Sequence, residues 1–126
     1  MKAVLVERYG PPQVARVAEV AAPVAGKGQV QVRVCAVALT SADARIRAAR
    51  FPRGFAPMAR LAFGLRKPRK PVLGAAFYGV VSEIGAQVSG LSVGDEVCGM
   101  TGMAMGAHAE LLAVEAKRVV RKPVEV

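Results

Sequence analysis

Aromatic residues are scarce in the sequence of 126 residues, which has no tryptophan, four phenylalanines and two tyrosines. Proteins that bind single-stranded nucleic acids stack the bases on aromatic rings, so this composition argues against nucleic acid as the main partner. A long continuous apolar run is absent too. The N-terminal stretch MKAVLVERYG alternates and reaches an acid at Glu7, unlike a signal peptide, and no segment approaches membrane-spanning length. We therefore expect a cytoplasmic protein without a membrane partner.

Cysteine and histidine are also rare. Cys35 and Cys98 are far apart and form no CxxC pair, which predicts two reduced, buried thiols instead of a disulfide framework or a zinc knuckle. The only histidine, His108, lies in GMTGMAMGAHAE (99–110) with three methionines and a glutamate. Thioether and imidazole groups bind soft or borderline metal ions, but a lone histidine is more often structural. We predict no metal site there.

Acidic residues are missing from one segment. Nine basic residues and no acidic ones occur between Arg45 and Lys70, whereas the rest of the chain has nine of each, so the net charge of +9 belongs to this segment. Three interpretations remain open: a basic loop over an anionic ligand or an acidic partner domain, a nucleic-acid patch, or a solvated surface. Residues 51–71 are predicted to form a long loop, with one helical turn within 58–64.

Short alternating strands account for most of the remaining chain. Residues 28–37 (GQVQVRVCAV) place Val30, Val32 and Val34 on one face, which is the pattern of a half-buried strand. The other strands that we expect cover residues 2–8, 14–20, 77–85, 95–100, 107–114 and 118–120. Their spacing and the thirteen glycines predict one mainly β domain over residues 1–126, a small barrel or sandwich.

A helix is predicted over residues 41–50. Thr40 and Asp43 have the spacing of a capping box, in which each side chain accepts a hydrogen bond from the backbone of the other residue. The alanines and arginines that follow favour a helix.

The run PVLGAAFYGVVSEIGAQVSGLSVGDEVCG (71–99) resembles the most recognisable block of the medium-chain dehydrogenase/reductase superfamily. The stretches MKAVLVERYGPP and VRVCAVALTSADARIR and the basic GLRKPRKPVLG linker resemble its alcohol dehydrogenase-like, quinone oxidoreductase branch. The resemblance covers essentially the whole chain. It implies a GroES-like, partly open β-barrel with one or two short helices, which is the catalytic domain of an oxidoreductase.

Two family zinc ligands are replaced. Thr40 stands where zinc-dependent members have a cysteine, and Ala75 stands where they have the histidine of GHE. Neither side chain can replace a thiolate or an imidazole on zinc. The resemblance therefore implies the zinc-independent branch, in which NADPH reduces a quinone or an enone-type small molecule.

The resemblance also implies site residues. Thr40, in TSAD, replaces the asparagine of NPAD, and it either donates a hydrogen bond in the catalytic site or only caps the helix. Asp43 matches an acidic family residue that lines the site or orients the helix start. Phe51 stands where some relatives have a tyrosine near the cofactor. Tyr78 is either a proton donor in a rebuilt site or an ordinary buried ring.

The dinucleotide fingerprint is absent from these residues, because no GxGxxG follows a strand. We expect the family's cofactor-binding domain to be missing here and the isolated chain to be inactive. The resemblance implies a homodimer in the full-length form, assembled through that domain. The alternative is a non-catalytic GroES-like module whose basic loop binds nucleic acid or an acidic partner.

Overall fold

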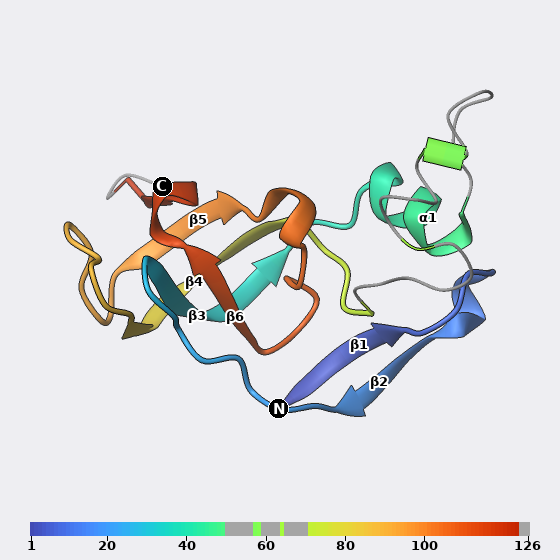
Figure 1. Ribbon diagram of the computed structural model, residues 1–126, viewed down its shortest axis with the longest axis horizontal. Helices are drawn as coiled ribbons and strands as arrows, with labels where there is room; N and C mark the ends of the chain where they lie inside the picture. Colours follow the sequence, from blue (N-terminus) through green and yellow to red (C-terminus); the bar gives the residue numbers. More distant parts are fainter. Residues whose placement is uncertain (50–56, 59–63, 65–70, 124–126) are drawn as a thin grey trace.

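A computed structural model describes residues 1–49, 57–58, 64 and 71–123 (Figure 1). The mainly β prediction is confirmed. The strands are β1 (Lys2–Val6), β2 (Ala15–Glu19), β3 (Gln29–Val37), β4 (Ala76–Ile84), β5 (Glu96–Met100), β6 (Leu111–Glu115) and β7 (Val119–Arg121). The helix α1 (Ser41–Ala48) follows β3, and three short 3-10 turns join other elements.

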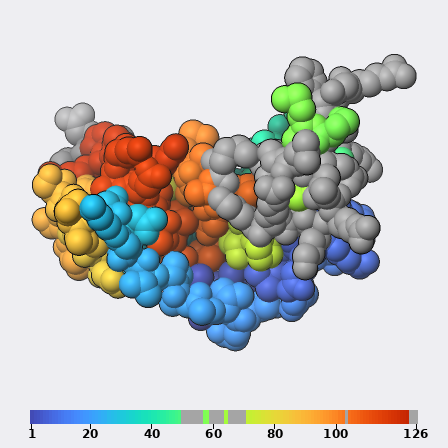
Figure 2. All heavy atoms as spheres, in the orientation of Figure 1, coloured from blue at the N-terminus to red at the C-terminus, as the bar shows by residue number. Residues whose placement is uncertain are grey.

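The strands form two antiparallel sheets. The larger sheet has the order β6-β3-β4-β5-β7, and β1 and β2 form a separate hairpin. Two isolated bridges, Ala3 to Ala109 and Leu5 to Val72, connect the hairpin to the rest of the fold. In Figure 2 the blue hairpin lies beneath the yellow-green residues that precede β4. The arrangement is the expected partly open β-barrel, since the larger sheet does not close on itself.

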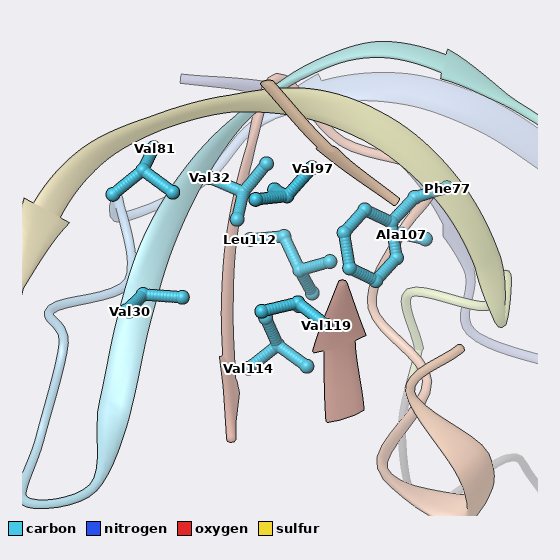
Figure 3. Close-up of a cluster of buried hydrophobic side chains, with 9 residues drawn as sticks. All are labelled: Val30, Val32, Phe77, Val81, Val97, Ala107, Leu112, Val114 and Val119. Atoms are coloured by element: carbon cyan, nitrogen blue, oxygen red, sulfur yellow. The ribbon is translucent and has the colours of Figure 1, made fainter. Parts of the chain in front are cut away.

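The core lies inside the curve of the larger sheet. Val30 and Val32 of β3 are fully buried, as their alternation predicts, whereas Arg33 is exposed. Figure 3 shows side chains from four further strands and one loop meeting them inside this curve. The buried cluster comprises Val30, Val32, Phe77, Val81, Val97, Ala107, Leu112, Val114 and Val119. Apolar burial of this kind is the main stabilising contribution to the fold.

The end of β3 leads to the candidate site. β3 pairs with β6 only as far as Arg33, whereas its pairing with β4 continues to Val37. Register shifts interrupt the β3–β4 ladder, and irregularities of this kind bend a strand and increase its twist. The segment beyond Arg33 therefore leaves the β6 side, and Cys35 is exposed there instead of buried as predicted. Cys98, by contrast, is half-buried.

The helix α1 begins as predicted and ends two residues early. The capping box of Thr40 and Asp43 is present at its start, and Ala49 takes a left-handed conformation that ends it. Pro57 and Met58 are helical, but most of the predicted loop and of the turn within 58–64 lies outside the described residues. Within the described ranges, no helix has the length and apolar character needed to cross a membrane.

Candidate active site

Thr40 and Asp43 line a cavity of about 300 Å³ between α1 and the β1–β2 hairpin. We call it the Thr40 cavity. Its other described lining residues are Val4, Val6, Pro12, Ala15, Leu39, Ala44, Arg47, Leu73 and His108. The walls are therefore mostly aliphatic, and the polar groups gather at the start of the helix. A mostly apolar pocket with a few convergent polar groups is typical of a small-molecule site.

The capping box fixes the two polar side chains relative to each other. Oδ2 of Asp43 accepts hydrogen bonds from the backbone N–H of Thr40 at 3.0 Å and from its hydroxyl at 3.2 Å. The backbone N–H of Asp43 donates to Oγ1 of Thr40 at 3.3 Å. Asp43 is buried, whereas Thr40 is exposed. The structure thus brings both predicted residues together at the start of α1.

His108 completes this polar group, and the sequence did not predict it. Its Nε2 lies 3.8 Å from Oδ2 of Asp43, and both side chains are 10% exposed. The same nitrogen is buried and has no hydrogen-bond partner in the described structure. The expected strand over 107–114 placed His108 and Glu110 on one face, but β6 begins only at Leu111. The rarity of histidine was the only signal in the sequence that marked this position.

An apolar groove of about 650 Å³ adjoins the Thr40 cavity, and four residues line both: Val4, Ala15, Leu39 and His108. The side chain of Leu39 is 83% exposed at this junction. Arg47 is the cation that lines the cavity, and its Nε donates to the carbonyl of Gly10 at 3.2 Å. Together the two hollows could hold a flat, mostly apolar molecule near the hydroxyl of Thr40.

Tyr78 lies in a different group of residues. Its hydroxyl donates to Oε1 of Glu96 at 2.7 Å, and Lys122 forms an ion pair with Oε2 at 3.2 Å. The hydrogen bond to Glu96 is the main reason why the pKa of Tyr78 is raised, and the same bond is the main cause of the lowered pKa of Glu96. Tyr78 is not among the described residues that line the Thr40 cavity. Phe51 lies outside the described residues.

Zinc does not fit the described residues. Thr40 and Ala75 supply neither a thiolate nor an imidazole at the two family ligand positions. Across the described ranges, no group of three or more histidine, cysteine, aspartate and glutamate side chains is placed to hold a metal ion.

The N-terminus of α1 does not offer an open site for the pyrophosphate of NADPH. A helix N-terminus binds phosphate through free backbone N–H groups. At α1, the side chain of Thr40 already accepts from the N–H of Asp43, and the carboxylate of Asp43 carries negative charge in the first turn. An anion would meet an occupied donor and a like charge there.

The sequence profile of the alcohol dehydrogenase GroES-like domain matches residues 26–124. The chain belongs to this family, as its resemblance to medium-chain dehydrogenases/reductases predicted.

Among solved structures, the quinone oxidoreductase from Coxiella burnetii is 26% identical with a TM-score of 0.83, and the comparison covers 100% of this chain and 38% of that one. A mycobacterial protein solved in complex with NADPH is 25% identical with a TM-score of 0.78, covering 100% of this chain and 35% of that one. The predicted likeness to quinone oxidoreductases is confirmed.

One relative with a similar sequence is far larger. The phenolphthiocerol synthesis polyketide synthase type I Pks15/1 of Mycobacterium marinum is 37% identical over 105 residues, which are 83% of this chain and 4% of that protein. The chain thus spans a small part of this relative and just over a third of the two solved structures. The activity of a whole enzyme is therefore a matter of proposal here.

Proposed function

We propose that the chain is the catalytic-domain portion of a zinc-independent, NADPH-dependent oxidoreductase that reduces quinones, activated alkenes or related carbonyl compounds in the cytoplasm. The likeness to quinone oxidoreductases and to a protein solved with NADPH supports this proposal. NADPH supplies a hydride when it is bound, and residues 1–126 by themselves are expected to have little affinity for it. Assembly as a homodimer in the full-length form stays a prediction.

The observation that carries the proposal is the position of the Thr40 hydroxyl. It lies on an apolar cavity, at the family position where zinc-dependent members have a cysteine ligand. A hydroxyl can donate a hydrogen bond to a carbonyl oxygen and so favour the negative charge that develops there during reduction. Thr40 would thus do by hydrogen bonding a part of what a metal ion does by charge.

The neighbouring residues suit this role. The capping box holds the backbone of Thr40 in place, so only the hydroxyl proton has to turn from Asp43 to meet a ligand. Aliphatic walls, with Val4 and Leu73 among them, exclude water and strengthen any hydrogen bond made inside the cavity. The proposed roles of Asp43 and Phe51 as lining residues belong to the same hypothesis. Proton donation by Tyr78 stays a prediction of the sequence.

A binding experiment tests the proposal on the chain itself. We expect duroquinone to shift the amide resonances of residues 39–44 and 108 in the isotope-labelled protein. Thr40→Ala should weaken this binding roughly two- to tenfold, because one hydrogen bond is lost, whereas Thr40→Ser should retain it. Shifts confined to residues far from the Thr40 cavity, or equal affinities for Thr40→Ala and Thr40→Ser, would contradict the proposed site.

A second test concerns the nucleotide. NADPH titrated into the 126-residue chain should give no saturation in the micromolar range, since the sequence contains no glycine-rich phosphate-binding turn. Micromolar affinity would show that the expectation about the cofactor-binding domain is wrong.

The alternative function is a non-catalytic binding module. The charge distribution favours it, because nine basic residues without an acid occur between Arg45 and Lys70. Binding to a random oligonucleotide that weakens steeply with added salt would support this function. Absence of binding at low salt would remove nucleic acid from consideration, and an acidic protein would be the remaining partner to test.

A further inference from the structure

Two hydrogen-bond donors of Thr40 and the Nε2 nitrogen of His108 lie around a single oxygen atom in the Thr40 cavity. Oδ2 of Asp43 already accepts from the backbone and from the hydroxyl of Thr40, at 3.0 and 3.2 Å. Nε2 of His108 lies 3.8 Å away, just beyond hydrogen-bond distance. The hydroxyl of Thr40 therefore occupies the acceptor closest to the imidazole.

The position of His108 is fixed by its backbone. Its N–H donates to the carbonyl of Leu73 at 3.0 Å, and its own carbonyl accepts from the N–H of Val4 at 2.9 Å. Its ring lies against Gly74, where even a methyl group would collide with it. The ring is thus held beside Asp43 while Nε2 stays buried and unpartnered. An unsatisfied buried polar atom destabilises the protein, so this nitrogen stands to gain from any nearby acceptor.

We propose that His108 is a positioning residue for Thr40: the Nε2–H of His108 and the hydroxyl of Thr40 compete for Oδ2 of Asp43. When a carbonyl oxygen in the cavity accepts the hydroxyl proton of Thr40, His108 takes the vacated place on Asp43. Ligand binding and closure of the His108–Asp43 pair are then one coupled exchange. The ligand part of this inference rests on the function proposed above.

The exchange has a simple physical basis. A threonine hydroxyl has one proton and can donate to only one acceptor at a time. If it turns to a ligand, Oδ2 loses one donor inside a mostly aliphatic cavity, where a poorly solvated carboxylate is unfavourable. A shift of less than 1 Å would bring Nε2 within hydrogen-bond distance and satisfy both buried atoms. The ligand then forms its hydrogen bond without leaving the carboxylate short of donors.

The exchange also defines the chemistry of the ligand. The ligand must carry an acceptor oxygen on a flat or compact apolar frame, as a quinone or an enone does. A hydrocarbon of the same shape could fill the cavity, but it could not draw the hydroxyl from Asp43. The state of the His108 ring therefore distinguishes filling of the cavity from recognition of a carbonyl group.

The first experiment needs no ligand. Since the chain has one histidine, its ring nitrogens give one set of NMR signals. Glycine is tolerated at the start of a helix, so Thr40→Gly removes the hydroxyl without removing the helix start. Thr40→Ser retains the hydroxyl and the helix start. We expect the ring signals of Thr40→Gly to show an Nε2–H that donates a hydrogen bond, and those of Thr40→Ser to match the wild type. Identical ring signals in all three proteins would overturn the competition.

The second experiment adds a ligand to the wild-type chain. Duroquinone is suitable because its ring has no vacant position for the exposed thiol of Cys35 to attack. It should move the His108 ring signals toward those of Thr40→Gly, whereas 1,2,4,5-tetramethylbenzene should leave them unchanged. Duroquinone bound in the cavity without any ring shift would overturn the coupling. A ring shift in Thr40→Gly together with no binding of duroquinone would support the competition and count against the proposed function alone.

Discussion

Tyr78 of β4 donates its hydroxyl proton to Oε1 of Glu96 of β5 at 2.7 Å. The two residues are diagonal neighbours, since the register pairs Tyr78 with Cys98 and Glu96 with Val80. Lys122 binds the other carboxylate oxygen, and its ammonium group lies 5.9 Å from the centre of the Tyr78 ring. This surface group connects the central strand of the sheet to the end of β7.

The group predicts how stability depends on pH. The hydrogen bond from Tyr78 lowers the pKa of Glu96, so its contribution is present above the ordinary glutamate pKa and is lost as the pH falls through the lowered value. The pKa of Tyr78 is raised chiefly by the same bond, so its contribution is present below the ordinary tyrosine pKa and is lost as the pH rises through the raised value. In Glu96→Gln, the midpoint of thermal unfolding should therefore change less with pH than in the wild type, both at the acid end and at the alkaline end of the range.

The matched control is Glu83→Gln, which removes the same charge from β4. It should keep the wild-type profile. In a Tyr9→Phe background, the ultraviolet absorbance of tyrosinate reports on Tyr78 alone, and Glu96→Gln should bring the phenol pKa nearer to its ordinary value. An unchanged tyrosine titration would show that the hydrogen bond does not form in solution.

Truncation of the core should be costly. Val97 of β5 is fully buried, and Val97→Ala should lower the free energy of unfolding by about 2 kcal/mol because apolar contact is lost and a cavity remains. Val120 of neighbouring β7 is 63% exposed, so Val120→Ala removes the same atoms with little effect. Chemical denaturation of both variants measures the difference. Equal losses would contradict the described core.

The helix start gives a third prediction. Thr40→Ala removes the side-chain acceptor for the N–H of Asp43, and it should cost about 1 kcal/mol of stability. Thr40→Ser retains the acceptor and should stay within a few tenths of a kcal/mol of the wild type. Thermal denaturation followed by circular dichroism distinguishes the two. If both variants melt like the wild type, the capping box contributes nothing measurable.

Gly74 gives a fourth prediction, because two constraints act on it. Its φ of 98° disfavours any side chain, and an added methyl group would collide with the ring of His108. Gly94 has nearly the same φ, 95°, and open space around it. Gly94→Ala should cost about 1 kcal/mol, and Gly74→Ala roughly 1–3 kcal/mol more. The Gly74→Ala/His108→Ala double variant should lack most of this additional loss, because the ring that the methyl group would meet is gone. Denaturation curves of the three variants measure the difference.

Local patterns predicted most of the fold. The alternation of β3 placed Val30 and Val32 in the core, and the spacing of Thr40 and Asp43 predicted the helix start. Both patterns depend only on residues that are close together in the sequence, so they can be recognised without knowledge of the tertiary structure. The family blocks then indicated how these elements combine. The strand ends differ more from the prediction: the strand expected over 107–114 begins only at Leu111, because strand ends depend on which neighbours continue the ladder.

The pairing of His108 with Asp43 could not be predicted in this way. His108 precedes β6, where alternation no longer tells which way a side chain points. Its orientation comes from backbone hydrogen bonds to Leu73 and Val4, which are far away in the sequence. Cys35 was wrongly predicted to be buried for a related reason. The partner strand β6 no longer covers β3 beyond Arg33, and nothing in the local sequence marks that point.

The two isolated bridges that attach the β1–β2 hairpin also affect the dynamics of the fold. One wall of the Thr40 cavity belongs to this hairpin, and the opposite wall belongs to α1. The attachment consists of these bridges and a few backbone hydrogen bonds, among them those from Val4 to His108 and from Val6 to Pro71, so we expect the hairpin to separate at a lower free-energy cost than unfolding of the valine core. The amide protons of Val4 and Val6, which bond to the carbonyls of His108 and Pro71, should therefore exchange with solvent before those of β3 and β4. The Thr40 cavity therefore widens whenever the hairpin separates from the larger sheet.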